Sequence, residues 1–349
     1  MRICVQIIIT RRACQNERFF RLRHLRRKQL RLLRHRVMQM KMQIKIGTRG
    51  SQLALWQAEW VKTRIQSLFP EIEPVIVPIK TTGDRIVDRP LAMVGGKGLF
   101  VKEIEKALLD KEIDLAVHSM KDMPGDLPEG LIIGAVPVRE NPFDAVLSAG
   151  EKSLMELPPG ATVGTSSLRR SSQVKHARPD LHVRSIRGNL DTRMKKLDSG
   201  EFDAILLAAA GLIRLDMAHV ITEYLSEATM VPAAGQGALC VETRENDNFI
   251  NPLMEQLNDP DTRKCVTGER AFLRQIEGSC HVPVGCFGRI KDKDRVFFTG
   301  IVSSEDGTLV IKESMESGPN DTASTGIELA NRLLDKGAKT ILENISSND

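Results

Sequence analysis

The sequence lacks a long hydrophobic run. Its longest apolar stretch, residues 204–213, is interrupted by Gly211 and is shorter than the ~18 residues that a membrane-spanning helix needs. We interpret it as a buried strand that leads into a turn, and we expect no membrane partner. At 349 residues the chain is long enough for two or three domains, each with its own core.

Cysteine is sparse and irregularly spaced. The six cysteines fall at positions 4, 14, 240, 265, 280 and 286, with no CxxC pair, and the histidines are dispersed. This spacing predicts neither a disulfide framework nor a zinc site, and it is typical of a protein from a reducing compartment. We therefore expect no bound metal.

The body of the chain also lacks the basic excess that its overall net charge of +5 suggests. Residues 1–41 contain eleven Arg and two Lys against one acid, Glu17, which leaves 37 of the 50 basic and 44 of the 45 acidic residues in the body. The body therefore has a net charge of −7. Composition gives no argument for nucleic-acid binding by the body, and we expect none.

Residues 1–41 are rich in arginine and poor in acids, and the composition changes abruptly at Met42. We expect a disordered tail or a misassigned start, with translation beginning at Met38, Met40 or Met42. The alternatives are an organelle transit peptide, although the usual serine enrichment is missing, or a basic arm that binds RNA or membrane. The segment leaves organelle targeting open for a chain that we otherwise expect in the cytoplasm.

From Met42 onward, strand-like and helix-like segments alternate, which is the pattern of an α/β protein. Residues 46–51 and 163–167 both combine a strand end, a Gly-Thr turn and a serine that caps a helix. Residues 111–117 and 200–206 also resemble each other. We interpret these similarities as two lobes with the same architecture. Their helix N-termini would face a shared cleft and favour anions. Matches this short also arise by chance in α/β proteins.

The last ninety residues differ in pattern. Residues 296–302 and 308–314 alternate like strands, and residues 321–334 look helical. They predict a small third domain of the α+β type, with Cys280 on a loop near its start.

Arginine is concentrated between residues 165 and 196. The cluster comprises Arg169, Arg170, Arg178, Arg184, Arg187 and Arg193, with Lys175, Lys195 and Lys196 among them. Because guanidinium groups pair bidentately with carboxylates and phosphates, it predicts a polyanionic ligand. Arg169 and Arg170 open a helix, where cations oppose the helix dipole by a few tenths to ~1 kcal/mol, so an anion should lie nearby. A solvated basic face would explain Lys195 and Lys196 equally well.

Three further residues are candidates for chemistry. Lys97 lies in a glycine-rich stretch that is not a P-loop, and it either reaches an anion from a mobile loop or marks a surface turn. Asp122 follows a buried strand end, where it could stabilise a cationic intermediate or relay a proton, or be an ordinary turn residue. Cys280 is either a reactive thiol on a glycine-flanked loop, suited to covalent attachment, or a buried structural thiol.

Taken together, seven ordered motifs are similar to those of the porphobilinogen deaminase family. They are TRGSQLALWQ at 48–57, GGKGLF at 95–100, HSMKDMP at 118–124, GTSSLRR at 164–170, RGN at 187–189, PAAGQG at 232–237 and GSCHVP at 278–283. The resemblance runs from about Met42 to the C-terminus. Residues 1–41 have no counterpart in it.

The resemblance implies three domains: residues 42–140 with 238–256, residues 143–231, and residues 260–349. The first two would be α/β lobes similar to those of periplasmic binding proteins, and the third a smaller C-terminal α+β domain. It also implies a monomeric transferase of heme and tetrapyrrole biosynthesis, a hydroxymethylbilane synthase. Such an enzyme condenses four porphobilinogen molecules head to tail, releases ammonia each time and frees the linear hydroxymethylbilane with water.

The resemblance further implies a dipyrromethane cofactor, joined to Cys280 by a thioether, on which the chain grows. Asp122 matches the family's catalytic aspartate. Positions that match cofactor contacts are Lys121, Asp122, Ser167, Arg169, Arg170 and Gly188, and those that match substrate contacts are Arg49, Ser51, Lys97, Arg187, Arg193, Arg214 and Gln236. Each pyrrole brings an acetate and a propionate, so a growing chain needs many cationic partners. The competing reading, a non-catalytic anion-binding protein on the same fold, would need neither Asp122 nor Cys280.

Overall fold

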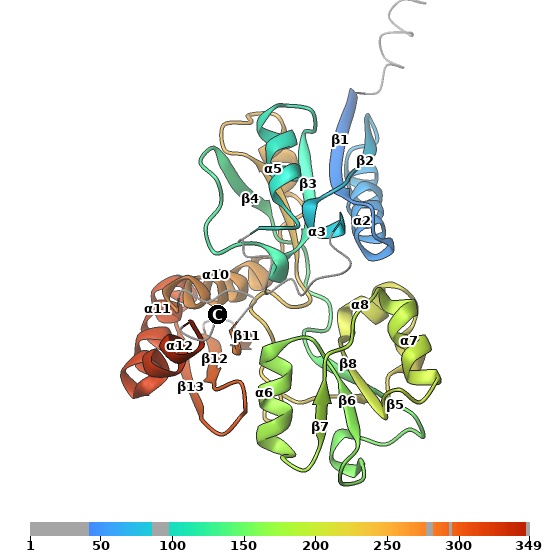
Figure 1. Cartoon of the computed structure of the whole chain (residues 1–349). Helices are drawn as coiled ribbons and strands as arrows, with labels where there is room; N and C mark the ends of the chain where they lie inside the picture. Colours follow the sequence, from blue (N-terminus) through green and yellow to red (C-terminus); the bar gives the residue numbers. More distant parts are fainter. Residues whose placement is uncertain (1–41, 86–97, 277–281, 293–294, 347–349) are drawn as a thin grey trace, which may run out of the picture.

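The computed structural model describes residues 42–85, 98–276, 282–292 and 295–346. They form three parts, each with its own sheet: two sheets of five strands and one of three. Figure 1 shows the parts as a blue to green lobe, a green to yellow lobe and an orange to red C-terminal part. The proposed tail at residues 1–41 lies outside the described residues.

The first lobe is built on a mixed five-stranded sheet. Its strands are β1 (Met42–Arg49), β2 (Ile72–Ile79), β3 (Leu115–Ser119), β4 (Leu131–Ala135) and β10 (Leu239–Arg244), in the order β2-β1-β3-β10-β4. Strand β1 is parallel to β2 and β3, whereas β10 is antiparallel to β3 and β4. Helices α2 (Gln52–Leu68), α5 (Lys102–Leu109) and α9 (Ile250–Glu255) cover the sheet. Ser51 caps α2 as predicted, since its side chain accepts the N–H of Ala54.

The second lobe repeats this arrangement. Its strands are β5 (Asp144–Ser148), β6 (Thr162–Gly164), β7 (His182–Arg184), β8 (Ala204–Ala208) and β9 (Glu223–Tyr224), in the order β7-β6-β8-β5-β9. Strand β6 is parallel to β7 and β8, and β5 is antiparallel to β8 and β9. Its helices are α6 (Leu168–Ala177), α7 (Leu190–Asp198) and α8 (Ala209–Arg214).

The repeat extends to individual hydrogen bonds. In the first lobe, Asp114 accepts the backbone N–H of Lys45 at 2.7 Å, and in the second, Asp203 accepts that of Thr162 at the same distance. Each aspartate directly precedes the last of the three parallel strands of its lobe in chain order. Its side chain accepts a hydrogen bond from the backbone of the first of these strands. The prediction of two lobes with the same architecture is therefore confirmed.

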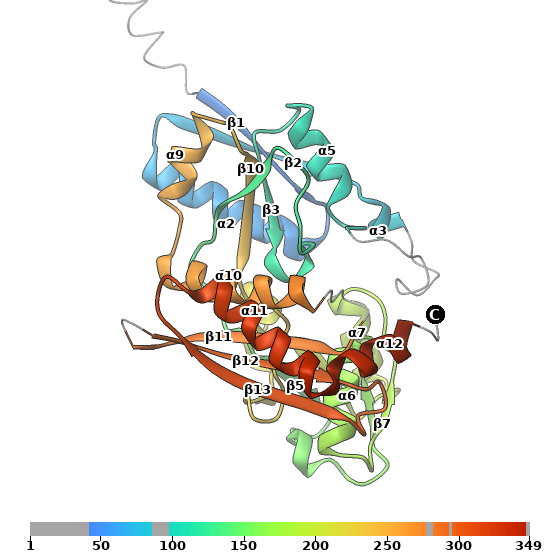
Figure 2. The ribbon, with the colours of Figure 1, turned by 90° about the vertical axis from the view of Figure 1, so that its left-hand side faces the viewer.

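The C-terminal part has the predicted α+β composition. Strands β11 (Val284–Asp292), β12 (Arg295–Ser303) and β13 (Val310–Ser317) form an antiparallel sheet. Helices α10 (Pro260–Gln275) and α11 (Thr322–Leu333) lie against one face of it, followed by α12 (Lys339–Ser346) (Figure 2). Phe272, Phe298 and Leu329 are fully buried between helices and sheet.

A buried carboxylate joins this part to the crossing segments between the lobes. Glu269 of α10 accepts hydrogen bonds from the Arg139 guanidinium at 2.6 and 3.1 Å. It also accepts the N–H groups of Gly235 at 2.6 Å and Gly288 at 2.7 Å. Removing the Glu269 side chain would leave the Arg139 guanidinium without its carboxylate and the two backbone N–H groups without their acceptor, although Arg139 Nε would keep its bond to the Gln236 carbonyl at 2.8 Å.

Candidate active site

Four of the predicted site residues come together where the two lobes face each other: Lys121, Asp122, Arg169 and Arg170. The 3-10 turn η1 (Met120–Asp122) follows β3 of the first lobe, and α6 begins after β6 of the second. Between them runs the crossing segment 232–238, whose Ala238 carbonyl accepts the N–H of Met120 at 3.0 Å. Gly235 of this segment packs so closely on Met120 that a Cβ atom would lie 2.5 Å from its Cγ. Strand ends of both sheets thus contribute to one site, as in other open α/β folds.

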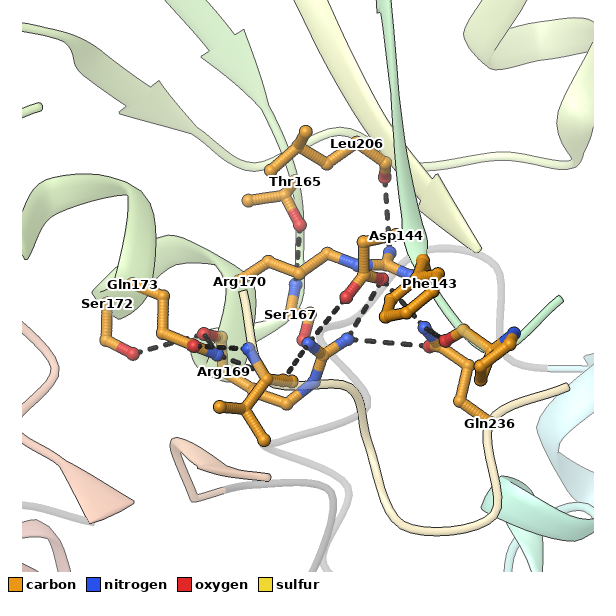
Figure 3. Close-up of polar contacts among 12 residues, drawn as sticks. Phe143, Asp144, Thr165, Ser167, Arg169, Arg170, Ser172, Gln173, Leu206 and Gln236 are labelled. Atoms are coloured by element: carbon orange, nitrogen blue, oxygen red, sulfur yellow. Dashed lines mark hydrogen bonds and ion pairs between the residues drawn. The ribbon is translucent and has the colours of Figure 1, made fainter. Parts of the chain in front are cut away.

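At the centre is a carboxylate that the sequence reasoning missed, Asp144 at the start of β5 (Figure 3). Arg169 contacts both of its oxygens, with Nη1 at 2.7 Å and Nη2 at 3.1 Å. Arg170 Nε donates to Oδ1 at 2.7 Å, and Gln236 Nε2 donates to the same oxygen at 3.0 Å. Asp144 is fully buried, so it is the anion that two arginines at a helix N-terminus require.

The cluster keeps an excess of positive charge. Burial alone would raise the pKa of Asp144, but Arg169 and Arg170 hold it well below its usual range, so the carboxylate is ionised. One negative charge then faces two guanidinium groups. Nη1 of Arg169 also donates to the Val231 carbonyl at 2.8 Å, and Nη1 of Arg170 to that of Leu206 at 3.2 Å. The site is therefore rigid and cationic, which suits a polyanion.

Lys121 adds a second unbalanced cation. Burial, and then the charge of Arg170, lower its pKa to about 8, against the opposing effects of Asp122 and Asp144. An anion that binds beside such a lysine raises its pKa again, because the negative charge stabilises the ammonium form. Lys121 and Asp122 are both half-buried, so part of each side chain remains accessible to a ligand.

The outer arginines have other surroundings. Arg193 Nε donates to the carbonyl of Gly188 at 3.0 Å, and Arg187 is exposed. Arg214 is buried, with Nη2 2.8 Å from the Gly237 carbonyl and its guanidinium 6.0 Å from the ring centre of Trp56 in the other lobe. Burial lowers the pKa of Arg214 to about 10 despite the nearby Glu140.

Arg49 lies at the end of β1 and is already paired. Its Nε donates to Asp84 at 3.2 Å, and its guanidinium stacks 4.0 Å from the centre of the Phe100 ring. A ligand carboxylate would therefore compete with Asp84 for this arginine. Ser51 serves as the N-cap of α2, whereas Ser167, at the start of α6, makes no capping bond with its side chain.

Two predicted residues, Lys97 and Cys280, lie outside the described residues. Within the described ranges, no cluster of side chains with metal-ligand character is present. No helix in the part of the chain that the structure describes is long and apolar enough to cross a membrane.

Comparisons with known proteins agree with this geometry. The profile of the porphobilinogen deaminase dipyrromethane cofactor binding domain matches residues 44–252, and that of the porphobilinogen deaminase C-terminal domain matches residues 263–335. The chain belongs to the porphobilinogen deaminase family. A porphobilinogen deaminase from Syntrophotalea carbinolica is 50% identical over 299 residues, which cover 86% of this chain and 95% of that protein. One from Bacillus subtilis is 48% identical over 303 residues, covering 86% and 96%.

Two solved structures also show some similarity to the chain. One is a probable amino-acid ABC transporter extracellular-binding protein from Bacillus subtilis, with a TM-score of 0.39 and 11% identity over 62% of this chain and 90% of that one. The other is a TRAP periplasmic solute binding protein from Desulfovibrio salexigens, with a TM-score of 0.38 and 10% identity over 64% and 73%.

Family membership confirms the predicted activity. The porphobilinogen deaminase family comprises transferases that make hydroxymethylbilane in tetrapyrrole biosynthesis, and the first matching profile is that of its dipyrromethane cofactor binding domain. The excess positive charge around Asp144 fits a cofactor and a substrate that both carry carboxylates.

Proposed function

We propose that the region where the two lobes face each other performs head-to-tail condensation of porphobilinogen, with Asp122 as the catalytic carboxylate. The observation that carries this proposal is the rigid arginine pair around Asp144, close to the half-buried Lys121 and Asp122. The surrounding cations bind ligand carboxylates, and Asp122 is left as the anion available for a positively charged pyrrole nitrogen.

Each of the remaining site residues has a proposed contact. Those proposed to hold the cofactor are Lys121, Asp122, Ser167, Arg169, Arg170 and Gly188, with Cys280 as its point of attachment; those proposed for the substrate are Arg49, Ser51, Lys97, Arg187, Arg193, Arg214 and Gln236. When bound, the dipyrromethane supplies the pyrrole end from which the chain grows. The protein binds acidic side chains, excludes water from them and orients them toward Asp122.

The role of Asp122 is electrostatic. Loss of ammonia leaves positive charge on the substrate pyrrole, and a fixed carboxylate stabilises charge that develops during a reaction more strongly than water does. Removing such a group from a preorganised site lowers kcat by ~10²–10³-fold. Asp122 can also accept the proton that the coupled pyrrole loses, because a carboxylate is a competent base at close range.

The matched pair Asp122→Asn and Asp126→Asn tests this assignment. Asp126 lies four residues further on and pairs at 3.0 Å with Arg274 on the surface. We expect Asp122→Asn to keep the thermal unfolding temperature of the parent and to lose at least ~100-fold in ammonia release, with Asp126→Asn near normal. Normal turnover in Asp122→Asn would remove Asp122 from the mechanism.

Intact-protein mass tests the attachment site. We expect the purified chain to exceed its sequence mass by two linked pyrrole units, and Cys280→Ser to lack this excess. An unchanged excess in the variant would exclude Cys280 and require another anchor. The same spectrum identifies the N-terminal residue and so decides whether residues 1–41 are present.

The domain limits given above, a monomeric state, a cytoplasmic location and the absence of nucleic-acid binding by the body complete the proposal. Size-exclusion chromatography with light scattering distinguishes a monomer from a dimer. The charge of −7 in residues 42–349 supports the expectation about nucleic acid.

A further inference from the structure

Arg270 is a buried arginine with an unusual set of partners. It lies on α10, is 7% exposed, and within the described residues forms no ion pair with a carboxylate. Burial lowers its pKa, as expected for a charge that has lost its water. A buried charge is expensive unless it is hydrogen-bonded, so its contacts indicate what it does.

Among the described residues, all hydrogen bonds of the Arg270 side chain go to the segment that carries the proposed catalytic residues. Nη2 of Arg270 donates to the carbonyls of Pro124 and Gly125, each at 2.9 Å, and Nη1 lies 4.0 Å from the sulfur of Met120. The guanidinium thus touches the chain on both sides of Lys121 and Asp122. It links this turn to a helix that belongs to a different part of the fold.

The turn has few bonds of its own. One backbone hydrogen bond spans the turn: the N–H of Met123 donates to the carbonyl of Met120 at 3.1 Å. The crossing segment supports Met120 on one side, through Ala238 and the close approach of Gly235. From α10, Arg270 supplies the two shorter hydrogen bonds, and the exposed Arg274 adds one to the Gly125 carbonyl at 3.3 Å. A planar guanidinium that reaches two consecutive carbonyls fixes their relative position, whereas the single ammonium of lysine does not.

We propose that Arg270 is a positioning residue that holds the Lys121–Asp122 turn in its reactive geometry. This inference rests on the proposed roles of Lys121 and Asp122. In this arrangement α10, whose sequence continues toward Cys280, is bonded directly to the turn that carries the catalytic carboxylate. A displacement of the turn by about 1 Å is enough to lower a rate up to ~100-fold.

Arg263 provides a matched control on the same helix. Its Nη2 donates to the Ile133 carbonyl at 2.9 Å and its Nη1 lies 3.3 Å from Asn258 Oδ1, so it supports β4 and not the turn. The experiment compares Arg270→Lys, Arg270→Met and Arg263→Met in the loaded enzyme, with the cofactor content of each measured by intact mass. kcat is expressed per loaded molecule, and KM and the unfolding temperature are measured in parallel.

We expect both Arg270 variants to lose ~10–100-fold in kcat with little change in KM. Arg263→Met should lose comparable thermal stability and less than about threefold in kcat. In Arg270→Ala, added guanidinium ion should restore part of the activity, and methylammonium should not. A purely structural role would show equal losses in the Arg270 and Arg263 variants and no rescue by guanidinium, which would overturn the proposal.

The result is separable from the assignment of Asp122. If Asp122→Asn is inactive while Arg270→Lys and Arg270→Met retain normal kcat, the site stands and the positioning role is wrong. If Asp122→Asn is fully active, the proposed function of the turn itself fails. Arg270→Lys keeps the charge and most of the volume, so it remains informative if Arg270→Met fails to fold.

Discussion

Glu105 is a buried carboxyl group in the first lobe, and its pKa should make stability depend on pH. It lies on α5 and is 5% exposed, close to Glu242 of β10. Oε2 of Glu242 contacts His118 Nε2 at 3.0 Å, while Oε1 of Glu105 and Oε1 of Glu242 have no hydrogen-bond partner among the described residues. Burial, and then repulsion from Glu242, raise the pKa of Glu105 to about 7, against the opposing effects of His118 and Lys102.

The direction of the effect follows from proton linkage. Because the folded-state pKa lies above the unfolded value of 4.5, the folded state holds the proton more tightly. Stability contributed by the protonated carboxyl is fully present below pH 4.5 and is lost as the pH rises through 7. At ~1.4 kcal/mol per pKa unit, a rise from 4.5 to about 7 corresponds to a loss of at most about 3.5 kcal/mol. Relaxation of the protein around the ionised carboxylate reduces this cost, and we expect about 1–2 kcal/mol.

Glu105→Gln tests this reasoning, since a neutral amide of the same shape cannot ionise. When the pH rises from 5 to 8, the parent should lose stability that Glu105→Gln keeps. The free energy of unfolding of Glu105→Gln minus that of the parent should therefore increase by about 1–2 kcal/mol. Both tryptophans of the chain, Trp56 and Trp60, lie on α2 of this lobe, so their fluorescence in urea reports its unfolding. The exposed Glu112→Gln is the control and should show no such trend. The same difference between variant and parent at pH 5 and at pH 8 would refute the argument.

Three further predictions concern the region between the lobes. Asp144→Asn should lower the free energy of unfolding by ~3–5 kcal/mol, because it leaves two buried guanidinium groups without their anion; an unchanged urea midpoint by circular dichroism would contradict this. Gly237→Ala should destabilise more than Gly150→Ala, since both have positive φ but only at Gly237 would a Cβ lie 2.4 Å from a backbone oxygen; equal melting temperatures would refute it. In Cys280→Ser protein, which should lack the cofactor, Lys121 should titrate near pH 8 by ¹³C NMR, and a midpoint above 10 would show that it is not desolvated.

The sequence predicted the parallel strands of both lobes better than the antiparallel ones. Strands β1 and β6 carry Gly-Thr pairs at or next to their ends, and β8 is a short apolar run, which are local signals. Strand β10 gave no such signal, because the polar residues Glu242 and Thr243 are buried on its two opposite faces. It is also contributed to the first lobe from beyond the second, so its partners depend on topology that no local pattern encodes. Strands β4, β5, β9 and β11 were missed as well.

The candidate site shows the same division between local and long-range information. Two arginines at a helix start predicted a nearby anion, because they oppose the helix dipole. They could not identify it, since Asp144 precedes Arg169 by 25 residues and is brought there by the antiparallel pairing of β5 with β8. Arg270 is further removed still: its partners lie about 145 residues away in the chain. Residues that touch a ligand could be proposed from motifs, whereas those that hold them in place could not.

The hydrogen bonds and exposure of the arginines suggest that they have different roles in ligand binding. Arg169 and Arg170 are buried and already bonded to Asp144 and backbone carbonyls, so their positions are fixed before any ligand arrives. Such groups suit a cofactor that stays bound, because the side chains are already ordered in the folded protein and binding costs no further side-chain entropy. Arg187 is exposed and can follow carboxylates that enter and leave. Gln236 is fully buried and donates to Asp144, so beside its proposed substrate contact it holds the arginine pair in place, and we expect its loss to weaken cofactor binding as well as to raise the KM for porphobilinogen.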